Sequence, residues 1–297
     1  MPLSANPAPR FPTGWRARLA SLGERRLPLL PLRRLRDGAP EAEVMAAVRA
    51  LASVVPMAGN MLLCRTLGRY KLFVDASDVA HGPHLACDGY WKWWVTTFLA
   101  RNLRPGETVV DGGAAYGYFT LLAADLVGAE GRVVAVEPQA RLAGLLVRSL
   151  RLNGFEGRVT VADKALVAHP GIGWATFKAD PEIPSGGSVA SDGASVPATT
   201  LDALLPEGAD FVKLDLNGGE EAAWAGMQGM LQRRAGLRVL LTFDPARCTA
   251  PADWLEAMAR RFPLRRVDHD GKARDADPAA LLAGGEATLF LAREAPG

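Results

Sequence analysis

The sequence predicts an α/β fold: a mostly parallel, seven-stranded sheet with helices on both faces, preceded by an N-terminal extension of helix and strand. Two observations predict it. From Glu107 onward, short apolar runs alternate with segments of helical periodicity, which is the pattern of successive βαβ units. A turn of small residues, from Gly112 to Gly117, joins the first apolar run to the first helix. Such a turn lets the backbone approach a ligand, so these features together indicate a Rossmann-like sheet.

The individual elements of this sheet follow from their local patterns. The expected strands are 108–110, 132–136, 158–161, 211–214, 239–243, 264–267 and 288–291, of which the last two form an antiparallel pair at the sheet edge. The expected helices between them are 117–126, 140–153 and 220–234. Residues 168–200 are rich in Gly, Pro, Ser and Asp, which predicts a hairpin with 175–178 as one strand and a mobile loop over the sheet.

The region before this sheet has a different composition. Residues 1–38 are rich in Pro and Arg and predict a basic, poorly ordered lead-in, either solvated or in contact with acidic lipid or a polyanion. Segment 40–64 predicts mostly helix, interrupted at Pro56, because a starting proline is followed by acids and an apolar face. A strand at 70–74 and an aromatic helix at 88–102 follow. The expected organisation is a lead-in at 1–38, a helical extension or cap at 39–104, and a cofactor-binding domain at 105–297.

Composition and charge limit the class of protein. The chain has 297 residues, of which 49% are hydrophobic, enough for one large domain or one domain plus an appendage. The net charge of +2 gives no indication of a nucleic-acid partner. The longest apolar tract, 44–64, is broken by Arg49, Pro56 and Asn60, so no membrane span is predicted. Three widely spaced cysteines indicate a reducing compartment, and no secretory signal is recognisable, so a cytoplasmic protein is expected.

Two acids flank the glycine-rich turn. Asp111 ends the first strand, and Glu137 ends the second strand, twenty residues after Gly117. A carboxylate at the second position accepts hydrogen bonds from both ribose hydroxyls of a nucleoside cofactor. The turn fits Gly-x-Ala-x-x-Gly from Gly112, a dinucleotide pattern, or Asp-x-Gly-x-Ala-x-Gly from Asp111, an S-adenosylmethionine pattern, each with one glycine replaced. The negative charge of Asp111 disfavours binding of a diphosphate and favours the cationic S-adenosylmethionine. A third interpretation is an ordinary glycine-rich turn without a cofactor.

Seven short motifs occur in order along the chain. They include Asp-Gly-Tyr-Trp-Lys-Trp-Trp within 84–94, Val-Val-Asp-Gly-Gly-Ala-Ala-Tyr-Gly within 109–120, Val-Glu-Pro at 136–138 and Phe-Val-Lys-Leu-Asp-Leu-Asn-Gly-Gly-Glu at 211–220, with shorter motifs at 105–106, 152–155 and 200–202. Over roughly residues 70–245 the chain thereby resembles the FkbM-type methyltransferases, a class I family that uses S-adenosylmethionine. The resemblance implies the class I methyltransferase fold and methyl transfer, usually to a hydroxyl of a sugar or other small natural product.

Three positions depart from the usual pattern of that family. Ala115 replaces a common Asn, Asn217 replaces a common Glu, and Lys92 replaces a common acid. These departures bear on the choice of acceptor and on activity itself. The main cofactor positions implied by the resemblance are intact.

The resemblance places the cofactor around the glycine-rich turn. Glu137 is expected to bind the ribose, and Gly113 and Gly117 to line the methionine part, with Asp111 near its ammonium group. Asp163, after the third strand, is a candidate for binding the adenine amino group. Two alternatives are equally open: Asp163 is an ordinary turn acid, or the main chain of Lys164 and Ala165 binds the adenine. The residues expected to contact the cofactor are Asp111, Gly113, Ala115, Gly117, Tyr118, Glu137, Asp163 and Lys164.

Catalysis on a hydroxyl requires alignment of donor and acceptor and removal of a proton. Acids at the carboxyl ends of the strands are therefore candidates. Asp215 is expected to be the general base or a ligand of a divalent cation, with helix capping as the alternative. Asp244 is a candidate for a second oxygen ligand, but two candidate ligands do not predict a metal site. His84, or its neighbour His81, is a further candidate base, with an ordinary loop histidine as the alternative.

These residues are compatible with three functions. The leading one is O-methylation of a hydroxyl on a small molecule. A nicotinamide-dependent oxidoreductase is disfavoured by Asp111 and by the lack of a Tyr-x-x-x-Lys pair. A non-catalytic S-adenosylmethionine-binding protein is kept open by Ala115 and Asn217. Segment 39–102, with its aromatic side chains, is expected to cap the site or to form a homodimer contact.

Overall fold

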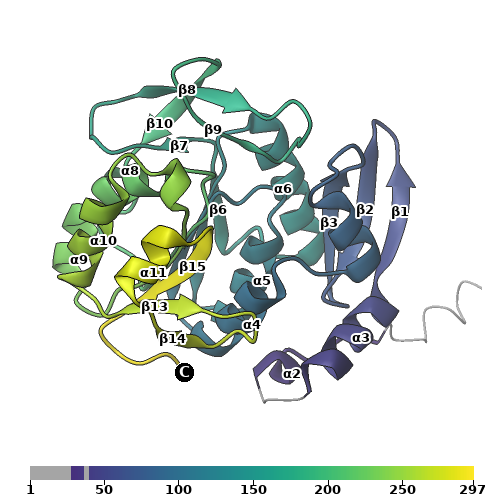
Figure 1. Cartoon of the computed structure of the whole chain (residues 1–297). Helices are drawn as coiled ribbons and strands as arrows, with labels where there is room; N and C mark the ends of the chain where they lie inside the picture. Colours follow the sequence, from purple (N-terminus) through teal and green to yellow (C-terminus); the bar gives the residue numbers. More distant parts are fainter. Residues whose placement is uncertain (1–27, 37–39) are drawn as a thin grey trace, which may run out of the picture.

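The computed structural model describes residues 28–36 and 40–297 (Figure 1). Most of the predicted basic lead-in therefore lies outside the described residues. Its described part contains helix α2 (Arg33–Arg36), whose Leu35 is buried together with Leu30. Arg36 donates a hydrogen bond to the carbonyl of Ala100 (2.7 Å), so this part of the lead-in packs against the body of the protein.

The central sheet confirms the predicted fold class. Its eight strands have the order β14-β13-β15-β12-β11-β4-β5-β6, and neighbouring strands from β6 to β12 are parallel. The strands are β4 (Thr108–Gly112), β5 (Arg132–Val136), β6 (Val159–Ala162), β11 (Phe211–Leu214), β12 (Arg238–Phe243), β13 (Leu264–Val267), β14 (Ala273–Asp275) and β15 (Ala287–Leu291). As predicted, β13 and β15 are antiparallel. The eighth strand, β14, extends the predicted seven because a turn at Gly271, with φ of 69°, pairs it with β13.

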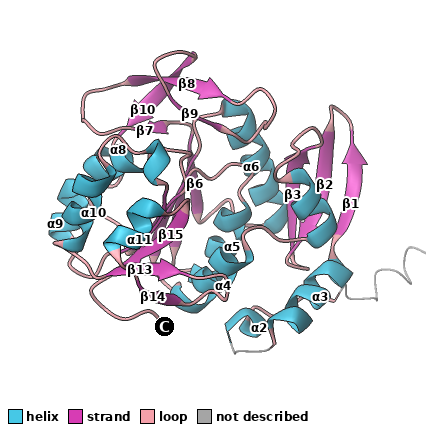
Figure 2. Cartoon of the chain, viewed as in Figure 1, coloured by secondary structure: helices cyan, strands magenta, loops and turns pink. Residues whose placement is uncertain are grey.

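Helices cover both faces of this sheet, and successive strand residues alternate between two cores. Val109 and Val133 point into a core that includes side chains of α4 (Trp93–Asn102), α5 (Tyr118–Val127) and α6 (Ala140–Asn153). Val110 and Val134 point into the opposite core. The opposite face is covered by α7 (Leu201–Leu204), α8 (Glu220–Ala225), α9 (Gln228–Arg233), α10 (Pro251–Ala259) and α11 (Pro278–Ala283), as Figure 2 shows.

The predicted helix at 220–234 is two helices in the structure. The chain breaks at Gly226, between α8 and α9, where a Cβ would overlap the carbonyl oxygen of Val167. The break lets the main chain lie against the segment that follows β7 (Ala165–Leu166). Periodicity alone does not reveal a contact of this kind.

The prediction of a mostly helical segment at 40–64 is wrong. Helix α3 (Glu41–Leu51) ends early, and β1 (Ser53–Met57), β2 (Met61–Thr66) and β3 (Tyr70–Asp75) form a three-stranded antiparallel sheet. The hairpin turn uses Gly59 and Asn60, both at positive φ (77° and 57°). The predicted strand at 70–74 is confirmed as β3. Its Phe73 amide donates to Ser149 of α6 (3.0 Å), which joins the small sheet to the main body.

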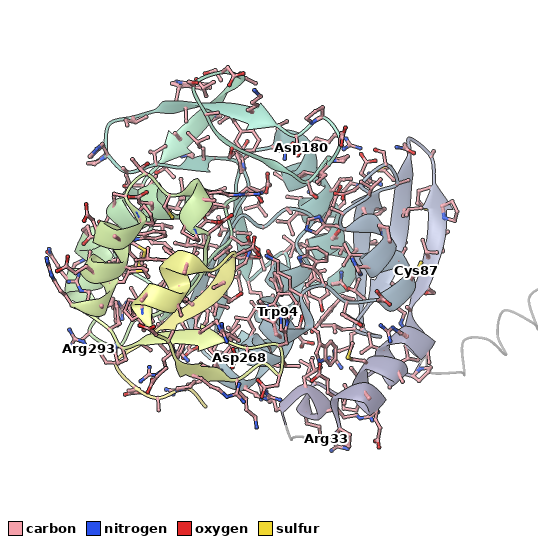
Figure 3. The ribbon with its side chains drawn as sticks, viewed as in Figure 1. Arg33, Cys87, Trp94, Asp180, Asp268 and Arg293 are labelled. Carbon is pink, nitrogen blue, oxygen red and sulfur yellow. The ribbon has the colours of Figure 1, made fainter. Side chains whose placement is uncertain are left out.

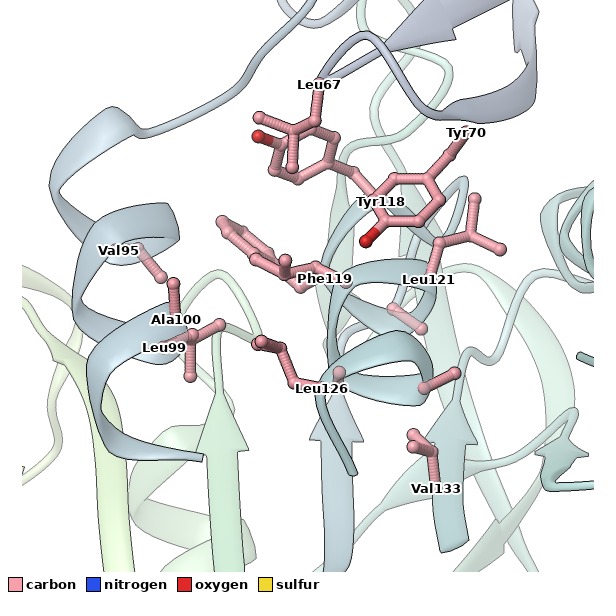
Figure 4. Close-up of a cluster of buried hydrophobic side chains, with 14 of the residues drawn as sticks. Leu67, Tyr70, Val95, Leu99, Ala100, Tyr118, Phe119, Leu121, Leu126 and Val133 are labelled. Carbon is pink, nitrogen blue, oxygen red and sulfur yellow. The ribbon is translucent and has the colours of Figure 1, made fainter. Parts of the chain in front are cut away.

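The aromatic helix begins later than predicted. A π-helix, η1 (His84–Asp88), is separated from α4 by residues 89–92, and Gly89 and Lys92 both have positive φ. Figure 4 shows Val95 and Leu99 of α4 facing Phe119 and Leu126 of α5, with Leu67 from the N-terminal sheet region at the same cluster. The N-terminal extension and the central sheet therefore share one hydrophobic core.

A second, four-stranded sheet lies across one end of the central sheet (Figure 1). It has the order β7-β10-β8-β9, from β7, β8 (Trp174–Ala179), β9 (Gly187–Val189) and β10 (Ala194–Thr199). The predicted strand at 175–178 is confirmed as β8, and two further strands, β9 and β10, lie where a loop was expected. A segment that we call the lid segment, residues 180–187, runs from the end of β8 to the first residue of β9, and Figure 3 shows Asp180 at its start, above the central sheet. Among the helices that the structure describes, none is long and apolar enough to cross a membrane.

Candidate active site

A cavity of about 630 Å³ lies at the carboxyl ends of the central strands. The glycine-rich turn and Glu137 form its floor, and the lid segment and Phe177 lie over it. The region before the central sheet contributes Ala80, His81, Leu85, Trp91 and Lys92 to one wall. Ligands of open α/β sheets bind at this edge, so the cavity is the candidate active site.

The glycine-rich turn approaches the neighbouring strand end very closely. Gly113 has φ of 73°, and a Cβ there would overlap the carbonyl oxygen of Asp215. The amides of Gly113 and Ala114 both donate to the carbonyl of Val136 at 3.0 Å. Gly117, with φ of 93°, packs against Leu146 of α6 and lies outside the cavity lining. Gly113 is thus placed to contact a ligand, whereas Gly117 shapes the turn.

Glu137 lines the cavity and is only 4% exposed. Its carboxyl group accepts hydrogen bonds from the amides of Ala115 and Gln139, each at 2.9 Å. Burial raises the pKa of Glu137 to about 7, against the opposing effect of these two amides. Each carboxylate oxygen has a second lone pair, which is free to accept from a ribose hydroxyl.

Asp111 does not line the cavity. It is 2% exposed, accepts from the Thr120 hydroxyl at 2.6 Å and pairs with the Lys213 ammonium at 2.9 Å. Lys213 also donates to the carbonyls of Gly112 (3.3 Å) and Gly113 (3.2 Å), so the pair supports the glycine-rich turn from below. Lys213 was missed by sequence reasoning, although a lysine inside the apolar run of β11 was a signal.

The other predicted positions divide into two groups. Ala115, Tyr118, Lys164 and Asp215 line the cavity, as does the departure Asn217. The remaining predicted positions lie outside the lining. Asp163 is exposed, Asp244 accepts from the amide of Ala246 at 3.0 Å to cap a short 3-10 helix, and His84 pairs with Asp88 at 3.0 Å.

Asp215 is held in an ion pair across the cavity. The ammonium of Lys92 lies 2.9 Å from its carboxylate and 3.4 Å from that of Glu286. Burial opposes ionisation of Asp215, but the charges of Lys92 and Lys213 outweigh it and hold its pKa well below the ordinary value. The following turn is capped by Glu220 instead, which accepts from the amides of Leu216 (2.5 Å) and Gly218 (2.9 Å). Asp215 therefore stays ionised and available to a ligand.

No group of three or more His, Cys, Asp or Glu side chains with the geometry of a metal site occurs within the described ranges 28–36 and 40–297. Asp215 and Asp244, the two oxygen ligands considered from the sequence, do not form such a group.

A parallel sheet with a glycine-rich turn after its first strand and a buried acid after its second defines the class of nucleoside-cofactor enzymes with a Rossmann-like fold. Residues 111–260, half of the chain, match the family model described as the methyltransferase FkbM domain. The chain belongs to this family of methyltransferases. Membership of this family favours S-adenosylmethionine over a nicotinamide cofactor.

Individual relatives are more distant. The chain is 30% identical over 113 residues to protein-L-isoaspartate O-methyltransferase 1 of Arabidopsis thaliana, covering 37% of this chain and 46% of that protein. It is 33% identical over 106 residues to the protein-L-isoaspartate O-methyltransferase of Methanopyrus kandleri, covering 35% of this chain and 43% of that protein. The chain thus matches less than half the length of these curated relatives. A solved structure of methyltransferase FkbM from Methylobacillus flagellatus superposes with a TM-score of 0.41 at 14% identity, covering 67% of this chain and 53% of that one.

The residues of the cavity fit S-adenosylmethionine. Gly113 lines the cavity and has no side chain, so a ligand can approach its main chain. The buried carboxyl of Glu137 matches a ribose, and ionised Asp215 adds negative charge that suits a cationic ligand.

Glu137 should make binding of S-adenosylhomocysteine dependent on pH. Because its pKa is about 7 in the free protein, raising the pH through that value ionises the acceptor of the ribose hydroxyls. We expect affinity to rise roughly tenfold between about pH 6 and about pH 8, measured by calorimetric titration. The raised pKa of Glu137 also makes the folding stability of the free protein depend on pH. Its contribution to stability is fully present below the ordinary glutamate pKa and is lost as the pH rises through about 7. Glu137→Gln should remove the pH dependence, and an equal slope in both proteins would contradict the assignment.

Proposed function

We propose that the enzyme methylates a hydroxyl group of a sugar or another small molecule. The observation that carries the proposal is the polar end of the cavity, where Lys92, Asp215 and Glu286 lie together and Trp91 lines the same cavity. Carboxylates and an ammonium group suit the hydroxyls of a polyol, and an indole supplies an apolar face. Bound S-adenosylmethionine supplies a methyl group already activated by its sulfonium.

In this proposal the side chains of the chain bind and orient the acceptor. Ionised Asp215 accepts a hydrogen bond from the reacting hydroxyl or its neighbour, and Lys92 fixes the position of that carboxylate. Because the pKa of Asp215 is low, it is a weak proton acceptor and is better suited to orientation than to proton removal. Asp244 and His84, which lie outside the cavity lining, have no part in the proposed mechanism.

Region 39–104 acts as a cap in this proposal, supported by the wall that it contributes to the cavity. A homodimer is also proposed, supported by the exposed Val54 (42%) and Val55 (53%) on β1, at the edge of the three-stranded sheet. We also propose that the protein is cytoplasmic.

The acceptor class can be tested with the purified full chain and S-adenosylmethionine labelled in its methyl group. A panel of methyl glycosides, a catechol and an isoaspartyl peptide separates sugar hydroxyls, phenols and carboxylates. The peptide is included because the matched relatives are named for isoaspartate methylation. Label on a glycoside or another small hydroxyl compound supports the proposal, and label on the peptide alone contradicts it.

Asp215→Asn should reduce turnover about 100-fold while leaving S-adenosylhomocysteine affinity within about twofold. The amide keeps the shape but removes the charge that pairs with Lys92 at 2.9 Å. Steady-state kinetics with the best acceptor of the panel measures the effect. The matched control is Glu256→Gln, which neutralises an acid paired with Arg260 on the exposed face of α10 and should leave turnover unchanged. Equal activity of the two variants would exclude the role given to Asp215.

A further inference from the structure

We propose that His81 is the general base that removes the proton from the acceptor hydroxyl. The inference rests on the proposed function, since a hydroxyl acceptor has a proton to lose. His81 lines the cavity, and its ring packs on that of Trp91 with centroids 4.2 Å apart. Three side chains far apart in the sequence meet behind this ring: Asp78, Tyr116 and Ser185.

Asp78 is the fixed acceptor of this cluster. It is 1% exposed and accepts from the Tyr116 hydroxyl (2.8 Å), the amide of His81 (2.8 Å) and the amide of Ser185 (3.2 Å). Burial opposes its ionisation, but hydrogen bonds from His81, Ser185 and Tyr116 outweigh burial and keep the pKa of Asp78 well below its ordinary value. Asp78 is therefore an ionised carboxylate, which accepts hydrogen bonds and donates none.

This acceptor determines which nitrogen of His81 carries the proton. The Ser185 hydroxyl contacts both the Asp78 carboxylate and Nδ1 of His81, the latter at 2.7 Å. Since ionised Asp78 has no proton to give, the single hydroxyl proton of Ser185 is donated to Asp78. Ser185 can then only accept from His81, so Nδ1 carries the ring proton of the neutral imidazole. Nε2 is left with its lone pair, and within the described residues it has no hydrogen-bond partner.

The proton step follows from this tautomer. The acceptor O–H gives its proton to Nε2 of His81, and the electron pair of that bond stays on the oxygen. The imidazolium that forms still donates from Nδ1 to Ser185, and its charge lies 3.6 Å from the Asp78 carboxylate. The ring then returns the proton to water. Among the described residues, Tyr116 is a further ionisable group near the ring: its ring centroid is 6.3 Å away and its hydroxyl is bound to Asp78.

The lid segment contributes one member of this chain of hydrogen bonds. Asp78 and His81 belong to the cap region, whereas Ser185 lies in the lid segment. The same segment is fixed by Gln139, which donates to the carbonyl of Gly186 (3.1 Å), and by Asn217, which donates to that of Gly187 (3.3 Å). His81 is thus oriented only when the lid segment lies over the cavity. Ser185 is a positioning residue.

The tautomer can be measured without any acceptor. The full chain, labelled with ¹⁵N in its four histidines and saturated with S-adenosylhomocysteine, is studied by long-range ¹H–¹⁵N correlation at about pH 8. The His81 signals are assigned by their loss in His81→Gln. We expect a protonated Nδ1 and an unprotonated Nε2, and we expect Ser185→Ala to lose this fixed pattern. A protonated Nε2 in the native chain would overturn the inference.

Kinetics with the best glycoside of the acceptor panel provides the second test. His81→Gln should lower kcat by 10²–10⁴-fold, the usual contribution of a general base, with S-adenosylhomocysteine affinity within about twofold. Ser185→Ala should lower kcat about 10-fold, with KM nearly unchanged and the acidic limb of the pH profile displaced. The control is His169→Gln, which alters an exposed histidine and should retain the native rate. Full activity of His81→Gln, or a comparable loss in His84→Gln alone, would overturn the assignment.

The two tests separate this inference from the proposed function. If no hydroxyl compound is methylated but Nε2 of His81 is unprotonated, the acceptor class fails and the assignment of the basic nitrogen is supported. If a glycoside is methylated while His81→Gln keeps the native kcat, the proposed function is supported and His81 is not the base.

Discussion

Gly113→Ala is expected to abolish S-adenosylhomocysteine binding and to destabilise the protein by several kcal/mol. The added Cβ meets two obstacles. The residue has φ of 73°, where an L side chain costs about 1–2 kcal/mol. The Cβ also overlaps the carbonyl oxygen of Asp215, which is main chain and cannot rotate away. Displacing β4 from β11 to relieve the overlap costs about 1–3 kcal/mol more and alters the floor of the cavity.

A second glycine isolates the effect of the overlap. Gly154, which follows α6, has φ of 70°, and a Cβ there meets nothing within 4 Å. Gly154→Ala therefore incurs only the conformational cost, about 1 kcal/mol, and should retain the native affinity. Chemical denaturation and calorimetric titration of both variants measure the two effects. Equal stability and equal affinity of the two variants would contradict the close contact between the main chains of Gly113 and Asp215.

The parts of the fold that sequence predicts are those with a local cause. The strands on both sides of the glycine-rich turn are apolar runs whose period and length suffice to place them. Glu137 is predicted to lie at the nucleoside site because it ends the second strand, and in the structure it lines the cavity. The parallel order of the sheet follows from the alternation of strand and helix.

The errors arise where two distant segments decide the local structure. The hairpin of β1 and β2 forms because Gly59 and Asn60 adopt positive φ and β3 supplies a partner strand, whereas composition alone suggests helix. From the sequence, Asp111 is an acid before a glycine-rich turn. Only the position of Lys213, 102 residues away, shows that Asp111 belongs to a buried ion pair. A local pattern carries no information about such a partner.

The same reasoning explains the change of candidate base. His81 and His84 are nearly equivalent in the sequence. They differ because Ser185, 104 residues from His81, meets its ring, whereas His84 pairs with Asp88 one helical turn away and is half exposed. The lid segment that carries Ser185 has the composition of a loop, so its ordered contacts could be found only in three dimensions.

Lys213→Met is expected to lower the free energy of unfolding by about 3–5 kcal/mol, or the melting temperature by roughly 10 °C. Lys213 and Asp111 are 5% and 2% exposed, and their ion pair at 2.9 Å is shielded from water. Methionine fills a similar volume but leaves Asp111 charged in the core, where the Thr120 hydroxyl is its one remaining partner among the described side chains. The carbonyls of Gly112 and Gly113 also lose a donor, so cofactor affinity should fall together with stability.

A double variant and a matched control show whether the buried charge is the cause. In Asp111→Asn with Lys213→Met, the uncompensated charge is gone and the amide oxygen still accepts from Thr120, so the double variant should be more stable than Lys213→Met alone. Lys178→Met breaks a pair with Asp192 in which both side chains are more than half exposed, and should cost no more than about 1 kcal/mol. Denaturant unfolding of the native chain, Lys213→Met, Asp111→Asn and the double variant gives the coupling energy of the pair, and Lys178→Met is measured beside them. If Lys213→Met costs no more than Lys178→Met, the buried pair does not stabilise the turn, and the support of the cavity floor must come from the main-chain contacts of Gly113 alone.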